Sequence, residues 1–225
     1  MIERENTHMS VIVIYTCMML FSAFGYEINA ISMNYSVTNL WNSYPIPDHR
    51  YIQFTLSSTD DKEHLCVEIN APFYNDPAPP SPPPPGPYPG LYNYEVVEIF
   101  FLNSTTNHYI ELEFGPHGHY LVILLTARRQ TFKQLLPLPD YTVEFPSPDR
   151  WVGRVHIPRS LFPSHIDRFN AYGIHGQGDN RTYEALYPAP KDSKQPDFHR
   201  LELFQPIHFD SLLYVGDKDG DSWNK

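Results

Sequence analysis

Two neighbouring runs decide the fold: Tyr94-Glu-Val-Val-Glu-Ile-Phe-Phe-Leu-Asn103 and His108-Tyr-Ile-Glu-Leu-Glu-Phe114, joined by Ser104-Thr-Thr-Asn107. Both runs are rich in β-branched and aromatic residues, and a short polar turn separates them, so the sequence predicts a β-hairpin. Because strand side chains alternate between two faces, pairing the runs across the turn gathers one apolar set on a single face. That set, which we expect in the core, is Val97, Ile99, Phe101, Ile110, Leu112 and Phe114.

The opposite face of this hairpin combines acids with aromatic rings. It carries Glu98, Glu111 and Glu113 beside Phe100 and Tyr109. We expect the next strand, reached through Gly115-Pro-His-Gly118, to add Tyr120 and Val122 to this face. A pairing shifted by one residue is disfavoured, because it would bury the unpaired charge of Glu98 in the apolar set at a cost of several kcal/mol.

The rest of the chain from Met33 onward has the same character, with short β-branched and aromatic runs between Pro, Gly, Asn and Asp. This pattern is typical of an all-β domain, and many short strands with turn signals predict an antiparallel β-sandwich. Ser160-Leu-Phe-Pro163 is expected to form a single helical turn. The predicted strands lie near residues 35–40, 50–57, 64–70, 94–103, 108–114, 119–125, 141–145, 151–157, 169–174 and 201–204.

The composition limits the partners. The 225 residues fit one domain with appendages, which we place at 33–210 between an N-terminal extension, 1–32, and an acidic flexible tail, 211–225. With 16 Lys+Arg against 26 Asp+Glu, the net charge is -10, which disfavours nucleic acid and anionic membranes as partners. Two cysteines cannot form a disulfide framework or a cysteine-rich zinc site.

The N-terminus contains an uncharged apolar run, residues 10–25, of the length of a signal-peptide core. Glu3 and Glu5 outnumber Arg4 before it, whereas a secretion signal normally begins with positive charge. Secretion with cleavage of residues 1–25 and retention in a reducing compartment both stay open. The sequons at Asn34, Asn103 and Asn180 would accept glycans only after secretion.

The segment 77–90, Pro-Ala-Pro-Pro-Ser-Pro-Pro-Pro-Pro-Gly-Pro-Tyr-Pro-Gly, is proline-rich and is expected to be polyproline II rather than a ladder strand. One interpretation is a ligand for a proline-reading protein domain. The other, which we favour, is a stiff surface loop between two strands.

Aromatic rings beside carboxylates, as on the hairpin's acidic face, are suited to bind a neutral polyol or sugar. The C–H faces of such a ligand pack on aromatic rings, and its hydroxyls form hydrogen bonds with carboxylates. The competing interpretation of the hairpin's acidic face is a solvated outer face of a sandwich. Glu111 and Glu113, about 7 Å apart along one strand, also fit the carboxyl spacing of glycoside hydrolysis.

The other polar motifs carry weaker signals. The histidines have no metal-binding spacing with Glu98 or Glu184, so neither a metal nor a cofactor is predicted. Arg181 suits a bidentate contact, either to a buried carboxylate, which we favour, or to a ligand. Asp217-Lys-Asp-Gly-Asp221 is similar to the start of a calcium loop, but the chain ends before a closing Glu.

Several longer motifs together resemble an animal family whose human member is named only as an open reading frame of chromosome four. The resemblance runs from about Met33 to Phe209 and implies a cytoplasmic protein, because the members begin near Met33 without a secretion signal. The motifs are Trp41-Asn-Ser-Tyr-Pro45, Ile69-Asn-Ala-Pro-Phe-Tyr-Asn-Asp-Pro77, Tyr94–Leu102, Tyr109–Gly118, Tyr183-Glu-Ala-Leu-Tyr-Pro188 and Gln195-Pro-Asp-Phe-His199.

More remotely, Val97-Glu-Ile-Phe-Phe101 and Tyr109–Gly118 are similar to the carbohydrate-binding modules of family nine, β-sandwiches that hold sugar ends between aromatic rings. Arg181 and the late Pro-Asp-Phe segment follow in the same order. Tyr92-Asn93 stands where those relatives often have Trp-Asp, and the three tryptophans here are dispersed.

Taken together, these features predict a β-sandwich that binds a carbohydrate or similar polyol without catalysis. Two alternatives stay open: a hydrolase-type enzyme using a Glu/His site, and a protein-interaction domain using the proline-rich loop. The oligomeric state is left open. The candidate ligand-binding residues are Tyr92, Tyr94, Glu98, His117, His175, Arg181, Glu184 and Tyr187.

Overall fold

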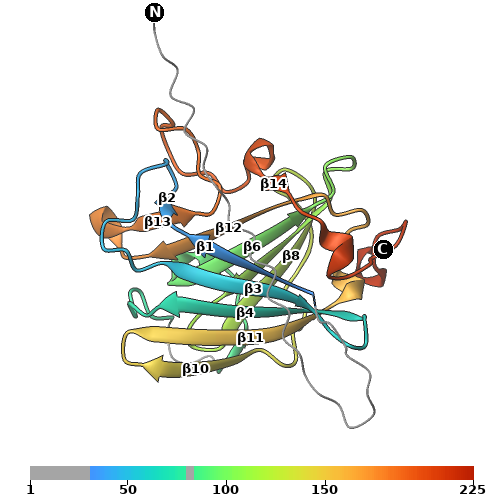
Figure 1. Cartoon of the computed structure of the whole chain (residues 1–225), viewed down its shortest axis with the longest axis horizontal. Helices are drawn as coiled ribbons and strands as arrows, with labels where there is room; N and C mark the ends of the chain where they lie inside the picture. The colour runs from blue at the N-terminus through green and yellow to red at the C-terminus, as the bar shows by residue number, and fades with distance from the viewer. Residues whose placement is uncertain (1–30, 80–83) are drawn as a thin grey trace, which may run out of the picture.

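The computed structural model describes residues 31–79 and 84–225, which form two β-sheets packed face to face (Figure 1). The smaller sheet has the antiparallel strand order β1-β3-β4-β11-β10. Its strands are β1 (Ser32–Val37), β3 (Ile52–Ser58), β4 (His64–Pro72), β11 (Arg150–Pro158) and β10 (Thr142–Ser147).

The larger sheet has the order β2-β13-β12-β6-β7-β8-β5, with β14 beside β12 and β9 beside β8. All its pairs are antiparallel except β5 with β8. Its strands are β2 (Asn39–Leu40), β13 (Thr182–Ala185), β12 (Arg168–His175), β6 (Val96–Leu102), β7 (Tyr109–Phe114), β8 (His119–Ala127), β5 (Gly86–Pro87), β14 (Gln205–Pro206) and β9 (Gln130–Gln134).

The fold class is confirmed as an all-β sandwich. In the described part of the chain the helical elements are six short 3-10 turns: η1 (Leu91–Asn93), η2 (Arg159–Leu161), η3 (Gly178–Asn180), η4 (Leu201–Leu203), η5 (Phe209–Ser211) and η6 (Asp221–Trp223). The helical turn expected at 160–163 corresponds to η2. The strand predicted at 201–204 is wrong: this segment forms η4, closed by a hydrogen bond from the Phe204 N–H to the Leu201 carbonyl.

The predicted register of the central hairpin is confirmed. Val97 pairs with Phe114, Ile99 with Leu112 and Phe101 with Ile110, and all six side chains lie in the core between the sheets.

The face assigned to the next strand is wrong. Tyr120 lies opposite Phe114 and Val122 opposite Leu112, so both join the core instead of the acidic face. Directly opposed residues share a face of the sheet. The turn 115–118, closed by the Gly115 N–H bonding to the His119 carbonyl, sets this register, and Leu121, Ile123 and Leu125 take the other face.

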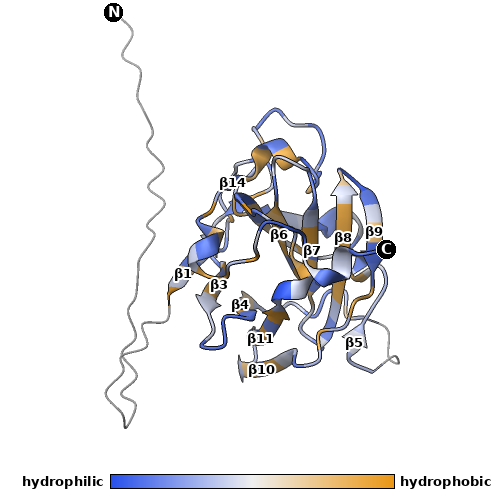
Figure 2. Ribbon diagram, turned by 90° about the vertical axis from the view of Figure 1, so that its right-hand side faces the viewer, coloured by the Kyte–Doolittle hydropathy of each residue, from blue (hydrophilic) through white to orange (hydrophobic). Residues whose placement is uncertain are grey.

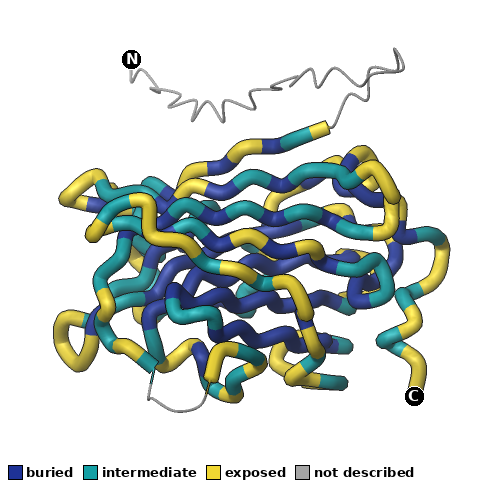
Figure 3. The backbone as a smooth tube through the Cα atoms, turned by 90° about the horizontal axis from the view of Figure 1, so that it is seen from below, coloured by how far each residue is buried: buried dark blue, intermediate teal, exposed yellow. Residues whose placement is uncertain are grey.

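The two sheets differ in how their outer faces are covered (Figure 3). Buried residues alternate with more exposed ones along β1, β3 and β11, as expected where one face contacts solvent. By contrast, every residue of β6 and β7 is buried, and apolar residues run along β6, β7 and β8 in Figure 2. A second apolar cluster on the outer face of the larger sheet, including Phe100, Tyr172, Phe198 and Phe204, accounts for this difference.

Part of the proline-rich segment does pair with a strand. Gly86 and Pro87 form β5, in which the Gly86 N–H bonds to the Gly118 carbonyl and the Tyr88 N–H to the Tyr120 carbonyl. The expectation that no part of 77–90 joins a ladder is therefore wrong here, because Gly86 and Tyr88 keep the N–H that proline lacks. Residues 80–83 lie outside the described part.

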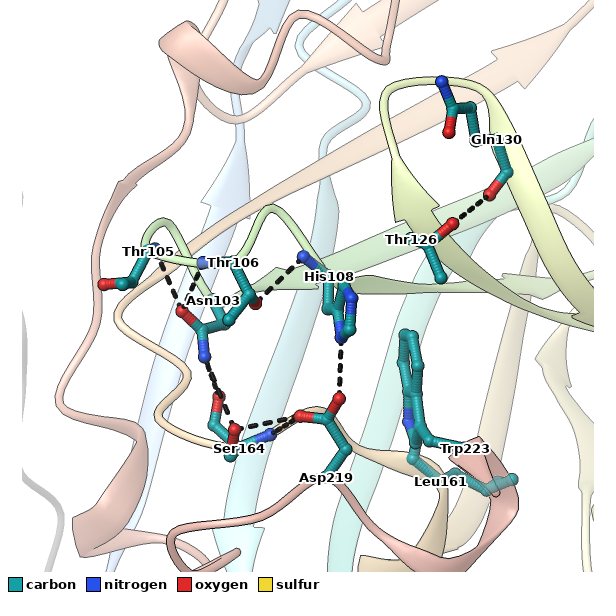
Figure 4. A network of polar contacts seen from close by, with 10 residues as sticks. All are labelled: Asn103, Thr105, Thr106, His108, Thr126, Gln130, Leu161, Ser164, Asp219 and Trp223. Carbon is teal, nitrogen blue, oxygen red and sulfur yellow. Dashed lines mark hydrogen bonds and ion pairs between the residues drawn. The ribbon is translucent and has the colours of Figure 1, made fainter. Parts of the chain in front are cut away.

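The C-terminal segment packs on the domain, which differs from the flexible tail expected for 211–225 (Figure 4). Asp219 accepts hydrogen bonds from the Ser164 N–H (2.8 Å) and hydroxyl (2.9 Å) and contacts His108 Nδ1 at 2.6 Å. The Trp223 ring stacks on His108 at 5.1 Å, and its indole N–H bonds to the Leu161 carbonyl.

Asn103 belongs to the same network. Its amide donates to the Ser164 carbonyl at 2.7 Å, and its oxygen accepts from the backbone of Thr105 and Thr106. The side chain is 2% exposed, so this sequon offers no free amide to a glycan. The apolar run at 10–25 lies outside the described residues, and no helix within them is long and apolar enough to cross a membrane.

Candidate functional site

The outer face of the larger sheet gathers three glutamates, Glu98, Glu111 and Glu113, here called the glutamate cluster. Glu98 on β6 lies opposite Glu113 on β7, and Glu111 is two residues from Glu113 on the same strand. The period of two along a strand therefore puts all three on one face. Their exposed fractions are 2%, 4% and 0%, and one oxygen of each lies within 4.8 Å of the others.

A cavity of about 470 Å³ opens above the cluster, and we call it the glutamate cavity. Glu98 and Glu111 form its base. Its remaining lining comes from the η1 turn, strands β8, β9, β12 and β13, the β8–β9 turn, the residue before β13, and the segment 196–199. These residues are Tyr92, Asn93, Ile123, Leu125, Arg129, Thr131, Gln134, Ile174, Arg181, Tyr183, Pro196, Asp197, Phe198 and His199.

Burial dominates the electrostatics of the cluster. It raises the pKa of Glu98 well above its usual value, and the nearby charge of Glu111 adds to the effect while Arg181 opposes it. Burial also raises the pKa of Glu113 well above its usual value, reinforced by Glu98 and Glu111, and raises the pKa of Glu111 to about 7. Without a neutralising partner, burial therefore favours the protonated form of these carboxyls in the folded protein.

Asp197 fastens the covering segment 196–199 to the sheet. Arg128 and Arg129, in the β8–β9 turn, both donate to its carboxylate, and Arg129 Nη2 does so at 2.8 Å. Although burial opposes it, these hydrogen bonds hold the pKa of Asp197 below its usual value. The same carboxylate accepts the His199 N–H at 3.0 Å, which fixes the start of η4.

Two rings of this segment reach the cavity. Phe198 stacks on Tyr172 with ring centres 3.9 Å apart. His199 Nδ1 lies 2.7 Å from the Tyr109 hydroxyl, and its Nε2 lies 3.9 Å from a Glu111 oxygen. Burial and the nearby Arg129 lower the pKa of His199 to about 4, so the imidazole is neutral at neutral pH.

Arg181 shapes the rim instead of pairing with an acid. Its guanidinium donates to the carbonyls of Tyr92 and Asn93, the latter at 3.1 Å, and to the Tyr183 hydroxyl at 3.0 Å. Among the described residues no carboxylate lies within ion-pair distance of it, so the favoured buried ion pair is not formed. Arg181 holds the η1 turn, and thereby Tyr92, against β13.

The structure divides the eight predicted site residues. Tyr92, Glu98 and Arg181 line the glutamate cavity. The other five do not line this cavity. His175 and Glu184 line a second cavity of about 370 Å³, where His175 Nε2 lies 3.4 Å from the Glu184 carboxylate. The remaining three make contacts within the protein: Tyr94 with Tyr88, His117 with Asn75, and Tyr187 with Phe169.

The prediction missed several residues of this site. Glu111 and Glu113 are expected on one face with Glu98 and also fit a hydrolase pair, yet they are absent from the predicted ligand-binding residues. Asp197, Phe198 and His199 stand in a motif noted for the family resemblance, but nothing in their local pattern indicates that they cover a strand face some 90 residues earlier.

The chain resembles known proteins along most of its length. No protein-family model matches it. It is 43% identical over 197 residues to the UPF0462 protein C4orf33 homolog of Rattus norvegicus, which covers 86% of this chain and 94% of the relative. It is 40% identical over 195 residues to the homolog of Danio rerio, covering 85% and 93%, and 39% identical over 197 residues to UPF0462 protein C4orf33 of Homo sapiens, covering 86% and 94%.

Among solved structures, the chain is similar to a protein of Bacteroides uniformis described as a "putative carbohydrate-binding protein". The TM-score is 0.57 at 14% identity, over 77% of this chain and 84% of that one, which supports the fold. The sequence identities with the rat, zebrafish and human proteins extend over nearly the whole of each relative, and they confirm the resemblance to the chromosome-four family: the chain belongs to the UPF0462 family.

Proposed function

We propose that this protein binds a small neutral polyol, such as a sugar, in the glutamate cavity without chemically changing it. The observation that carries the proposal is a base of buried carboxyls beneath aromatic walls. A protonated carboxyl both donates and accepts hydrogen bonds, as a sugar hydroxyl does, and the rings of Tyr92, Tyr183 and Phe198 line the cavity beside it.

Size and charge agree with this ligand. The volume of about 470 Å³ lies within the roughly 300–1,000 Å³ of small-molecule sites. The rim charges are already engaged, because Arg129 is paired with Asp197 and Arg181 with backbone carbonyls. A neutral ligand leaves these pairs intact. The neighbour in Bacteroides uniformis adds support through its fold and its description.

The test is a thermal-shift titration with a panel of mono- and disaccharides. A ligand at ~100 times its Kd adds about 2.7 kcal/mol to the free energy of unfolding, which raises the melting temperature measurably. We expect one sugar class to stabilise the protein. Tyr92→Ala, at a side chain that is 49% exposed on the rim, should weaken that effect without unfolding the domain.

The matched control is Tyr214→Ala, at a tyrosine that is 58% exposed and does not line the cavity. It should respond to the sugar as the unmodified protein does. If no sugar shifts the melting temperature, or if Tyr92→Ala responds undiminished, the proposal fails.

One observation favours a hydrolase as a second candidate function. Glu98 and Glu111 both reach the cavity, and a pKa raised to about 7 suits Glu111 as a general acid at neutral pH. Turnover of nitrophenyl glycosides that is lost in Glu111→Gln and kept in Glu144→Gln, an exposed acid on β10, would support it. Sugar binding without turnover would leave the first proposal standing alone.

Recognition of the proline-rich loop by a partner protein stays a prediction. Within this loop Tyr88 is engaged by Tyr94 and His119, at ring distances of 5.6 and 5.4 Å. A partner protein would therefore have to bind the proline side chains of the loop instead of Tyr88. Titration of the protein with a proline-reading domain tests this alternative.

A further inference from the structure

The glutamate cluster has a geometry that the sugar proposal does not explain. Two of its members suffice to form the base of the cavity, yet Glu113 lies behind them, 0% exposed and outside the cavity lining. Both Glu113 oxygens and Glu111 Oε2 are buried without a hydrogen bond of acceptable geometry. The groups that approach Glu113 are the Glu111 carboxyl and the Tyr92 backbone.

Buried carboxylate oxygens are normally paired with a donor or a cation. The cationic side chains nearby are committed elsewhere: Arg181 to backbone carbonyls and Arg129 to Asp197. Among the described residues, the only basic side chain within 4 Å of a cluster oxygen is His199, whose Nε2 lies 3.9 Å from Glu111 and whose imidazole is neutral at neutral pH. When its carboxyls are ionised, the cluster therefore has no protein group among the described residues that balances its charge.

The spacing of the oxygens fits a metal ion. Three points within 4.8 Å of one another have a common centre no farther than about 2.8 Å from each (4.8 Å divided by √3), close to the roughly 2.3–2.6 Å of Ca²⁺–oxygen bonds. A shift of a few tenths of an ångström in the side chains completes the contact. The donor set is all oxygen, which hard divalent cations prefer.

From these observations we propose that Glu98, Glu111 and Glu113 together bind one hard divalent cation, of the Ca²⁺, Mg²⁺ or Mn²⁺ class, at the base of the cavity. The strands supply three ligands from one side only. The cavity side leaves the remaining coordination positions to water or to hydroxyls of a bound ligand. Cation binding itself requires no sugar, so it is tested independently of the proposed function.

The experiment uses the full chain, freed of metal with EDTA and dialysed, in calorimetric titrations with CaCl₂, MgCl₂ and MnCl₂ at pH 7.5 without sugar. We expect one cation per chain. Glu98→Gln and Glu113→Gln, made separately, should each weaken binding at least tenfold, because each removes one charged ligand. Glutamine has nearly the shape of a protonated glutamate, so both variants are expected to fold, as circular dichroism will check.

The control is Asp217→Asn, in the segment Asp217–Asp221 that is similar to the start of a calcium loop; its carboxylate side chain is 84% exposed. Binding should be unchanged there. Anomalous diffraction from crystals soaked in MnCl₂ gives a second readout, which places the ion directly even if one variant fails to fold.

Three outcomes would overturn the proposal. The first is no binding at about 10 mM cation, beyond the range of weak calcium modules. The second is binding that is lost in Asp217→Asn and kept in both glutamine variants. The third is tighter binding in a parallel titration with ZnCl₂ than with the other three salts, lost in His199→Ala, which would assign the site to a different metal class.

Discussion

Glu98 on β6 lies directly opposite Glu113 on β7, and both side chains are almost completely buried. Like charges in directly opposed positions destabilise a sheet, and burial adds the cost of desolvation. The domain accepts this pair on the sheet face that adjoins the glutamate cavity. Such an arrangement is expected where the acids serve a ligand, and it has consequences for stability.

In the absence of divalent cations, we expect stability to fall as the pH rises from about 5 to about 7. Burial raises the pKa of each cluster carboxyl in the folded state, so over this range the unfolded chain binds fewer protons than the folded one. Each affected group then lowers the free energy of unfolding by up to about 1.4 kcal/mol per pH unit.

Urea unfolding in EDTA at several pH values measures this slope. Glu113→Gln should flatten it and should be more stable than the unmodified protein at pH 7. Glu144→Gln, at an exposed acid on β10, should keep the slope. A slope that is the same in all three proteins would contradict the assignment.

Asp197→Asn should loosen the cover of the cavity. It removes the carboxylate that Arg128, Arg129 and the His199 N–H share, at a cost of about 1–2 kcal/mol. Hydrogen exchange of residues 196–204 should become faster and sugar affinity should fall. Asp192→Asn, an exposed acid in the same connection, serves as the control, and equal exchange in the two variants would argue against the clamp.

Arg181→Lys should destabilise the rim by about 1–2 kcal/mol, because an ammonium group cannot reproduce the planar set of bonds to Tyr92, Asn93 and Tyr183. The comparison is Arg159→Lys, which changes an exposed ion pair with Glu63 and should be nearly neutral. The measurement is the melting temperature of each variant in thermal unfolding. Equal melting temperatures would mean that the carbonyl contacts contribute nothing.

Asp219→Ala should detach the C-terminal segment. The Ser164 N–H and hydroxyl and the His108 ring lose their acceptor, which costs about 1–3 kcal/mol. Trp223 fluorescence should report greater solvent exposure, because this ring stacks on His108. Asp217→Ala removes a neighbouring, mostly exposed acid and should change neither quantity. An unaltered Trp223 signal in Asp219→Ala would show that other contacts hold the segment.

Much of the fold could be read from local pattern. The alternation in the runs 94–103 and 108–114 fixed which residues of β6 and β7 face the core and put the three glutamates on one side. Edge elements were harder to recognise. β9 (Gln130–Gln134) has no apolar alternation, and η4 carries leucines that resemble a strand.

The sequence by itself determined the sandwich, the hairpin register and the shared face of Glu98, Glu111 and Glu113, because the period of two is a property of each strand alone. Only the tertiary structure decided that this face is covered instead of solvated. It also brought His199 to Glu111 and docked Asp219 onto Ser164 and His108. Those contacts join residues 55 to 111 positions apart, and their formation depends on the packing of the whole domain rather than on any local pattern.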